Sequence, residues 1–158
     1  MEAYTDFAKV YDEDENRYFV ESEGKIGYID KENTSKLEGD YVVVDISRQN
    51  LRLYHDKEEV LSTSVVTGKD STPSDIGLFD IDFMTTNTVL RGDNYASPVS
   101  YWMPYNGGEG LHDATWRSYF GGDIYHDNGS HGCINMPLDM AEEVYSHVNV
   151  GDKVLVKE

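Results

Sequence analysis

The chain has little cysteine and little positive charge. Cys133 is its only cysteine, which excludes an internal disulfide and a zinc site built from several thiolates. Lysine and arginine number 13 against 30 aspartates and glutamates, so the net charge is -17 at pH 7. A charge of this sign and size repels phosphate backbones and anionic membrane surfaces. We therefore expect no nucleic-acid partner.

Long apolar runs are also missing. No stretch of about 20 apolar residues occurs, so we expect no membrane span in this chain. The polar start, MEAYTDFAKV, is not a signal peptide, and if the protein is exported we expect the signal to have been cut away. The 158 residues are 39% hydrophobic, which is enough for a folded domain with a small appendage.

Residues 1–38 are expected to form a short β-rich appendage. Two strand-like pieces, Tyr18 to Glu21 and Lys25 to Ile29, flank the turn signal Ser22-Glu23-Gly24 and predict a β-hairpin. About forty residues are marginal for folding alone. The segment therefore either packs on the rest of the chain or is the tail of an upstream domain, and its GKIGYID resembles the last hairpin of a bacterial SH3-like module.

Residues 39–158 are rich in β-forming residues from Tyr41 on. The segments YVVVDIS, LRLYHD, VLSTSVVTG and GLFDIDFMTT are separated by polar and glycine-containing stretches. Apolar residues alternate with polar ones at Leu51 and Leu53, and again at Phe79, Ile81 and Phe83, as in strands with one wet face. The pattern predicts a mainly β fold, a sandwich or barrel.

The rest of this region is less regular. Asn94 to Gly122 mixes aromatic residues with five glycines, which indicates either loops lining a cleft or an irregular core. One helix is expected after Pro137, which suits a first helical position, and it should end near Asn149 or Gly151. Asp152 to Val156 is expected to be a closing strand. The predicted apolar face of the helix consists of Leu138, Ala141, Val144, Tyr145 and Val148.

The most informative stretch is Ser130-His131-Gly132-Cys133-Ile134-Asn135, directly ahead of that helix. A cysteine in a glycine-containing turn can be reached by several backbone amides, which favour the thiolate and lower the pKa of the thiol. That setting suits a nucleophile. The alternative is a buried, inert thiol.

A thiol nucleophile needs a base, and the chain offers His112 and His131. His131 is only two residues from Cys133, which constrains its approach, whereas His112 belongs to a separate segment and can reach the sulfur from across a cleft. We therefore expect His112 to be the base. The third group, which orients the imidazole, could be the Asp113 carboxylate or a backbone carbonyl.

Two other site chemistries receive less support from the sequence. His112, His126, His131 and Cys133 could together bind zinc, but no HExxH or CxxC spacing accompanies them, so no metal or cofactor is expected. The serines of the strand region lie in no G-x-S-x-G or S-x-x-K motif, which sets a serine hydrolase aside.

These residues resemble a known family. The string SHGCINM, with a histidine 21 residues before its cysteine in WMPYNGGEGLHDATWR, is similar to the YkuD-type L,D-transpeptidase catalytic domain. The segments YVVVDISRQNLRLY and VVTGK, and the turn from Thr72-Pro73 to Gly77-Leu78-Phe79, resemble the opening of that domain in the same order. The resemblance covers roughly Gly39 to Lys157.

The resemblance implies a β-rich fold of mixed sheets and a thiol enzyme that forms 3-to-3 peptidoglycan cross-links. Such an enzyme takes an acyl group from a tetrapeptide stem, releases D-Ala, and passes the group to a side-chain amine of an acceptor stem. Carried over, Cys133 is the nucleophile, His112 the base, and the carbonyl of Asp113 orients the imidazole. Backbone N–H groups of His131, Gly132 and Cys133 would face the oxyanion, with Ser130 shaping the turn.

The resemblance also has implications for ligands and location. The partners would be peptidoglycan stem peptides and, as covalent inhibitors, carbapenem-type β-lactams. The protein would act outside the cytoplasm, in the cell wall or on the outer face of the membrane. An L,D-carboxypeptidase or a non-catalytic wall-binding module are the alternatives. Asp113 departs from the glycine or serine found in several members. The expected substrate-binding residues are Tyr101, Trp102, Met103, Trp116 and Asn135.

Overall fold

The structure, a computed structural model, describes residues 8–22, 24–34, 36–92 and 95–158. Glu23 of the predicted turn and Asn94 of the predicted loop region lie outside these residues. The chain divides into two compact units, Met1–Leu37 and Glu38–Glu158. Within the described residues, no helix is both long and apolar enough to cross a membrane.

The smaller unit is a three-stranded antiparallel sheet in the order β1-β2-β3, followed by a short 3-10 helix. Only β2 and β3 are expected from the sequence. The first strand, KVYDE, is not predicted from the sequence, because all five of its residues are exposed and no alternating apolar face indicates a strand. The bounds are β1 (Lys9–Glu13), β2 (Arg17–Ser22), β3 (Lys25–Asp30) and the 3-10 helix η1 (Lys31–Asn33).

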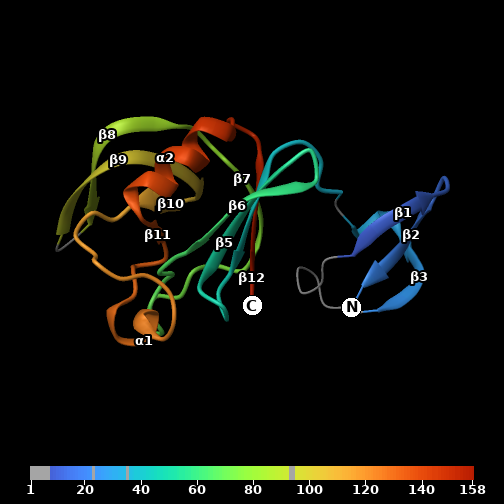
Figure 1. Ribbon diagram of the computed structural model, residues 1–158, viewed down its shortest axis with the longest axis horizontal. Helices are drawn as coiled ribbons and strands as arrows, with labels where there is room; N and C mark the ends of the chain where they lie inside the picture. The colour runs from blue at the N-terminus through green and yellow to red at the C-terminus, as the bar shows by residue number, and fades with distance from the viewer. Residues whose placement is uncertain (1–7, 23, 35, 93–94) are drawn as a thin grey trace. The chain divides into compact units, whose positions relative to one another are not determined.

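The larger unit contains two sheets that enclose one core (Figure 1). One has the order β6-β5-β4-β12-β7. Its strands are β4 (Tyr41–Asp45), β5 (Asn50–His55), β6 (Glu58–Ser64), β7 (Gly77–Asp80) and β12 (Lys153–Lys157). The other has the order β11-β10-β9-β8. Its strands are β8 (Thr85–Gly92), β9 (Tyr95–Asn106), β10 (Glu109–Asp113) and β11 (Ile134–Met136).

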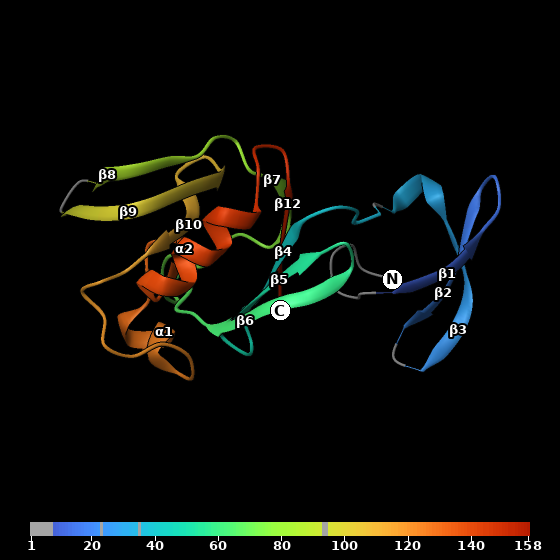
Figure 2. The same ribbon diagram turned by 45° about the horizontal axis from the view of Figure 1, so that its top comes forward.

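The predicted mainly β class, with mixed sheets and a helix near the C-terminus, is confirmed. Helix α2 (Leu138–His147) packs across β9 and β10 and buries Ala141 and Val144, two residues of its predicted apolar face (Figure 2). Pro137 lies at its N-cap rather than at its first helical position. A second, short helix, α1 (Ile124–Asn128), is absent from the sequence prediction because none of its residues is buried.

Two sequence predictions of this region are wrong. Most of the stretch expected to be loops or an irregular core is the hairpin of β9 and β10, whose turn has Gly107 at φ +56°. The expected alternation through Phe83 also fails, because β7 ends at Asp80 and Phe83 is 51% exposed. There the chain leaves one sheet for the other, and the Asp82 N–H donates to Pro104 O of β9.

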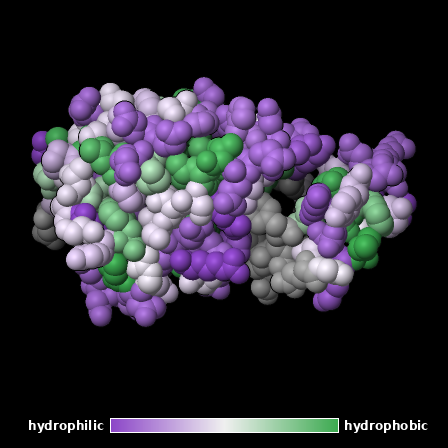
Figure 3. All heavy atoms as spheres, in the orientation of Figure 1, coloured by the Kyte–Doolittle hydropathy of each residue, from purple (hydrophilic) through white to green (hydrophobic). Residues whose placement is uncertain are grey.

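The core explains why β4 reads as an unbroken apolar run. Every residue of β4 is buried, because the strand lies between β5 and β12 and is covered on both faces. Side chains of both sheets and of α2 meet in one cluster, for example Val42, Met103 and Val144. The surface is different: hydrophilic residues cover much of the face of the larger unit in Figure 3, consistent with the acidic composition.

Candidate active site

The turn Ser130 to Cys133 leads directly into β11. That strand pairs in parallel with β10, with Leu111 opposite Ile134 and His112 opposite Asn135. Side chains two residues apart on a strand point to the same face. Cys133 immediately precedes β11 and is two positions from Asn135, so we infer that it projects to the same side as His112, although 21 residues separate the two in sequence.

The Ser130 hydroxyl fixes the shape of this turn. It accepts a hydrogen bond from the Gly132 N–H (3.0 Å) and donates one to Cys133 O (2.5 Å). The expectation that Gly132 offers its N–H to an oxyanion is therefore corrected, because Ser130 already uses that donor. Gly132 has φ +118°, a conformation that side-chain-bearing residues rarely adopt.

A second segment, Gly68 to Asp75, holds the turn from the other side. The Lys69 N–H and the Thr72 hydroxyl both donate to Ser130 O, at 3.1 and 3.0 Å. The buried Ser74 hydroxyl donates to Gly132 O at 2.6 Å and accepts from the Gly68 N–H. Carbonyl groups on both sides of His131 are thus bound by this segment.

The Cys133 thiol is partly buried between two residues of the β9–β10 turn region. It donates to Gly108 O at 3.5 Å, and the Gly110 N–H donates to the sulfur. Burial raises the pKa of Cys133 to about 11; the negative charge of Glu109 adds to this rise, while the N–H groups of Gly110 and Cys133 oppose it. The expected lowering of the thiol pKa is therefore wrong, and deprotonation at neutral pH needs a base.

His112 is 4% exposed and lies between the rings of Trp102 and Trp116, with centroid distances of 5.7 and 5.9 Å. Its Nδ1 lies 2.8 Å from Asp113 O. Burial lowers the pKa of His112, outweighing the Asp113 carbonyl and charge, which raise it. The imidazole is consequently neutral at neutral pH, the form that can accept a proton.

Asn135 holds the other ring nitrogen. In the amide orientation that gives both ends a partner, its nitrogen donates to His112 Nε2 (3.1 Å) and its oxygen accepts from Arg117 Nε (2.8 Å). Arg117 also donates to Asn128 O at 2.6 Å, which anchors the guanidinium. With Nδ1–H donating to Asp113 O, these partners assign the Nδ1–H tautomer and leave the lone pair on Nε2.

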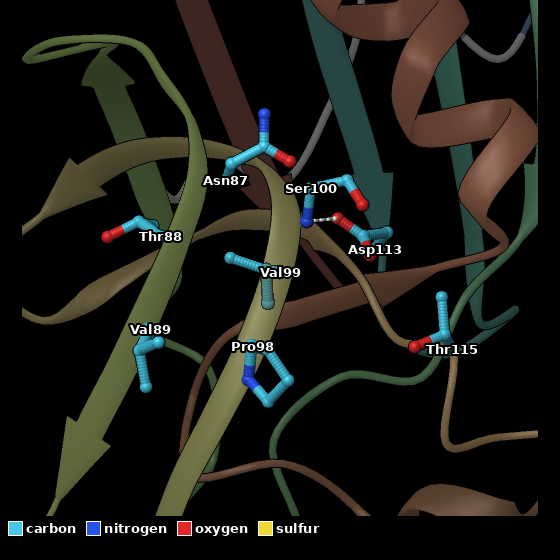
Figure 4. Close-up of a pocket in the computed structure, with 8 residues that line it drawn as sticks. All are labelled: Asn87, Thr88, Val89, Pro98, Val99, Ser100, Asp113 and Thr115. Atoms are coloured by element: carbon cyan, nitrogen blue, oxygen red, sulfur yellow. Dashed lines mark hydrogen bonds between the residues drawn. The ribbon is translucent and has the colours of Figure 1, made fainter.

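The Asp113 carboxylate faces away from the imidazole that its carbonyl orients. Its Oδ1 accepts the N–H groups of Ser100 (2.7 Å) and Tyr101 (2.8 Å) in β9, while no described residue pairs with Oδ2. This side of Asp113 lines a groove of about 310 Å³ between β8, β9 and the segment after β10 (Figure 4). The groove residues are Asn87, Thr88, Val89, Pro98, Val99, Ser100, Asp113 and Thr115.

The predicted substrate-binding residues separate into two groups. Trp102, Trp116 and Asn135 surround His112, and Trp116 is 49% exposed. Met103 alternates to the opposite face of β9 and is fully buried in the core, so its prediction is wrong. Tyr101 shares that face and packs its ring 5.2 Å from Tyr145 of α2, away from His112.

The remaining predicted residue, His131, is exposed and stacks on Tyr95 of β9, with ring centroids 5.1 Å apart. Around this site, sequence reasoning missed Ser74, Glu109, Gly110 and Arg117. Of these, Gly110 had a signal as the glycine of GEGLH that immediately precedes Leu111, and the Trp102 ring fills the place of a side chain there. In the described part of the chain, no three His, Cys, Asp or Glu side chains are grouped to hold a metal ion.

Comparisons with known proteins identify relatives of this chain among the L,D-transpeptidases. A family model described as the YkuD L,D-transpeptidase catalytic domain matches residues 39–156. L,D-transpeptidase 2 of Mycobacterium tuberculosis is 30% identical over 155 residues, covering 89% of this chain and 37% of that protein. The chain thus spans little more than a third of the length of this curated relative.

Solved structures of an Enterococcus faecium enzyme are similar as well. The crystal structure of a cysteine-to-serine mutant of the E. faecium L,D-transpeptidase has a TM-score of 0.73 and 39% identity, covering 76% of this chain and 50% of that one. The catalytic domain of that enzyme, acylated by ertapenem, has a TM-score of 0.71 and 38% identity, covering 77% of this chain and 99% of that one.

Proposed function

Because the chain belongs to the L,D-transpeptidase family through its YkuD catalytic domain, we propose that it forms 3-to-3 peptidoglycan cross-links by acyl transfer through Cys133. The observation that carries the proposal is the placement of a neutral, oriented His112 on the same face as Cys133. The location would be extracytoplasmic, where peptidoglycan lies. The ligands would be stem peptides and, by analogy with the ertapenem-acylated relative, carbapenems.

The first step makes the thiolate. Cys133 turns from Gly108 O toward the imidazole, and Nε2 of His112 takes the thiol proton while Asn135 shifts from that lone pair. The Asp113 carbonyl accepts Nδ1–H throughout and stabilises the imidazolium that forms. A base is required here, since the thiol has a pKa of about 11.

Acylation is the second step. The sulfur forms a bond to the carbonyl carbon of the third stem residue, and negative charge develops on the carbonyl oxygen. The N–H groups of Cys133 and Gly110 already face the sulfur, so they are the proposed donors to this oxyanion, in place of Gly132. The C–N bond then breaks, and the imidazolium returns its proton to the departing amine of D-Ala.

Deacylation repeats the chemistry with a new nucleophile. The side-chain amine of an acceptor stem attacks the thioester, its proton passes to His112, and the carbon–sulfur bond breaks to regenerate the enzyme. Trp102 and Trp116 flank the imidazole and would form apolar walls for the stems.

Intact-protein mass spectrometry tests the proposal. The protein is incubated with a carbapenem, beside Cys133→Ala, and then with a disaccharide-tetrapeptide with and without a second stem. A covalent adduct that the variant lacks, together with a cross-linked dimer, is the expected result. A tripeptide alone would assign the protein as an L,D-carboxypeptidase, and no adduct in a folded protein would indicate a wall-binding module.

A further inference from the structure

Glu109 lies beside the nucleophile but takes no part in the proposed acyl transfer. It is the first residue of β10, between Gly108, whose carbonyl accepts a hydrogen bond from the thiol, and Gly110, whose N–H donates to the sulfur. The side chain is only partly exposed. Glu109 is thus bonded directly to both residues whose backbone groups contact Cys133 Sγ.

The Glu109 carboxylate contacts two further segments of the site. Both of its oxygens accept the Asp75 N–H, at 3.4 and 3.2 Å. A Cβ added to Gly132 would lie 2.4 Å from Oε1, so the carboxylate packs directly on the catalytic turn. Asn106 donates to Asp75 Oδ2 at 2.8 Å and also bonds Glu109. One carboxylate thus joins the β9–β10 turn, the Gly68 to Asp75 segment and the catalytic turn.

The titratable groups facing Glu109 are acidic or neutral ones. They are Asp75 from the segment before β7, Tyr105 from β9, and Cys133 from the catalytic turn. Burial, then the charge of Asp75, raises the pKa of Glu109 to about 7, against the opposing Asp75 N–H and Asn106. The Tyr105 hydroxyl is buried with no partner among the described residues, and burial and then Glu109 raise its pKa.

We propose that Glu109 is a positioning residue that couples the nucleophile to pH: its ionised carboxylate opposes ionisation of Cys133, and its protonation removes that opposition. This rests on the proposed function only in taking Cys133 as the reactive thiol. Ionisation of either group disfavours ionisation of the other, because both charges are negative and both groups are partly shielded from water. Near pH 7, thiol reactivity should therefore rise less than tenfold per pH unit.

The test is alkylation of Cys133 by iodoacetamide, followed by intact-protein mass from pH 5.5 to 9. In Glu109→Gln the carboxylate charge is lost with nearly unchanged shape, so alkylation above pH 8 should be about threefold faster or more. Below pH 6, where Glu109 of the wild type is protonated, the two rates should converge. Asp75→Asn is the matched control, since it removes an adjacent charge and keeps the Asp75 N–H, and it should alkylate like the wild type above pH 8.

Three results would overturn the proposal. Glu109→Gln could match the wild type at every pH, or it could be faster by one constant factor down to pH 5.5, as a loosened turn would be. In the third case, Asp75→Asn would accelerate alkylation by as large a factor as Glu109→Gln does, which would indicate a general effect of net charge. Alkylation needs no stem peptide, so its pH profile tests the role of Glu109 independently of whether the protein is a transpeptidase.

Discussion

The carboxylate of Glu109 occupies the space that a side chain at Gly132 would need. A Cβ at Gly132 would lie 2.4 Å from Glu109 Oε1 and 2.9 Å from its carboxyl carbon. The glycine of the catalytic turn is therefore required twice, once by its φ of +118° and once by its neighbour.

Gly132→Ala, compared with Glu109→Ala and the double variant, should separate the cost of backbone strain from the cost of crowding by Glu109. We expect the substitution to destabilise the protein by about 1–3 kcal/mol through backbone strain, with an added cost from displacing Glu109. Carbapenem acylation should fall as well, because the turn carries Cys133. Urea unfolding of Gly132→Ala, Glu109→Ala and the double variant measures the contact. Strictly additive losses would show that Glu109 does not crowd this position.

Asp113→Ala should lower the free energy of unfolding, while the folded variant should keep most of its rate of acylation by a carbapenem. The substitution leaves the N–H groups of Ser100 and Tyr101 without their acceptor, at a cost of about 1–3 kcal/mol. The backbone carbonyl that orients His112 remains. Asp113→Asn, which keeps one acceptor oxygen, is the milder control. A severe acylation defect in folded Asp113→Ala would mean that the carboxylate itself serves the imidazole.

Asn135→Ala should shift the acid limb of the pH–rate profile to higher pH. Asn135 donates to the lone pair of His112 Nε2 and so favours the neutral imidazole. Loss of this donor raises the pKa of His112, so a higher pH is needed to generate the base. Acylation rates between pH 4.5 and 8 measure the limb. An unmoved limb, or one moved to lower pH, would contradict the assigned amide orientation.

Asp45→Asn should destabilise the protein at pH 7 but not at very low pH. Asp45 is 2% exposed; burial raises its pKa, but its bonds to Ser47, Lys157 and the Arg48 N–H outweigh burial and lower it. The stabilisation is complete above the unfolded pKa of about 4 and is lost as pH falls through the lower folded value. Urea unfolding at pH 7 and pH 2.5 compares the two proteins. An equal difference at both pH values would exclude a role for the charge.

Local patterns in the sequence predict the strands and helix whose faces are buried. Leu51 and Leu53 of β5 are fully buried, and α2 buries Ala141 and Val144, as their spacing indicates. The same reasoning fails where partners are distant. The Asp113 carboxylate turns to β9 because of N–H groups 12 and 13 residues away, and no periodicity records them.

The electrostatic properties of the site could not be predicted from the sequence either. The motif suggests an amide-stabilised thiolate, but burial and the charge of Glu109, which belongs to a different segment from Cys133, raise the thiol pKa instead. Similarly, a serine next to the motif predicts a shaped turn but not that its hydroxyl uses the Gly132 N–H. Such outcomes depend on the sum of solvation and charge around an atom, which requires coordinates.

The pairing of β12 with β4 has a consequence for how this unit acquires its structure. β12 runs parallel to β4 and antiparallel to β7, so the final strand is inserted between two strands made more than 70 residues earlier. The five-stranded sheet cannot close until Lys153–Lys157 have left the ribosome. Folding of this sheet is therefore expected to be slow, with long-range loop closure limiting its rate.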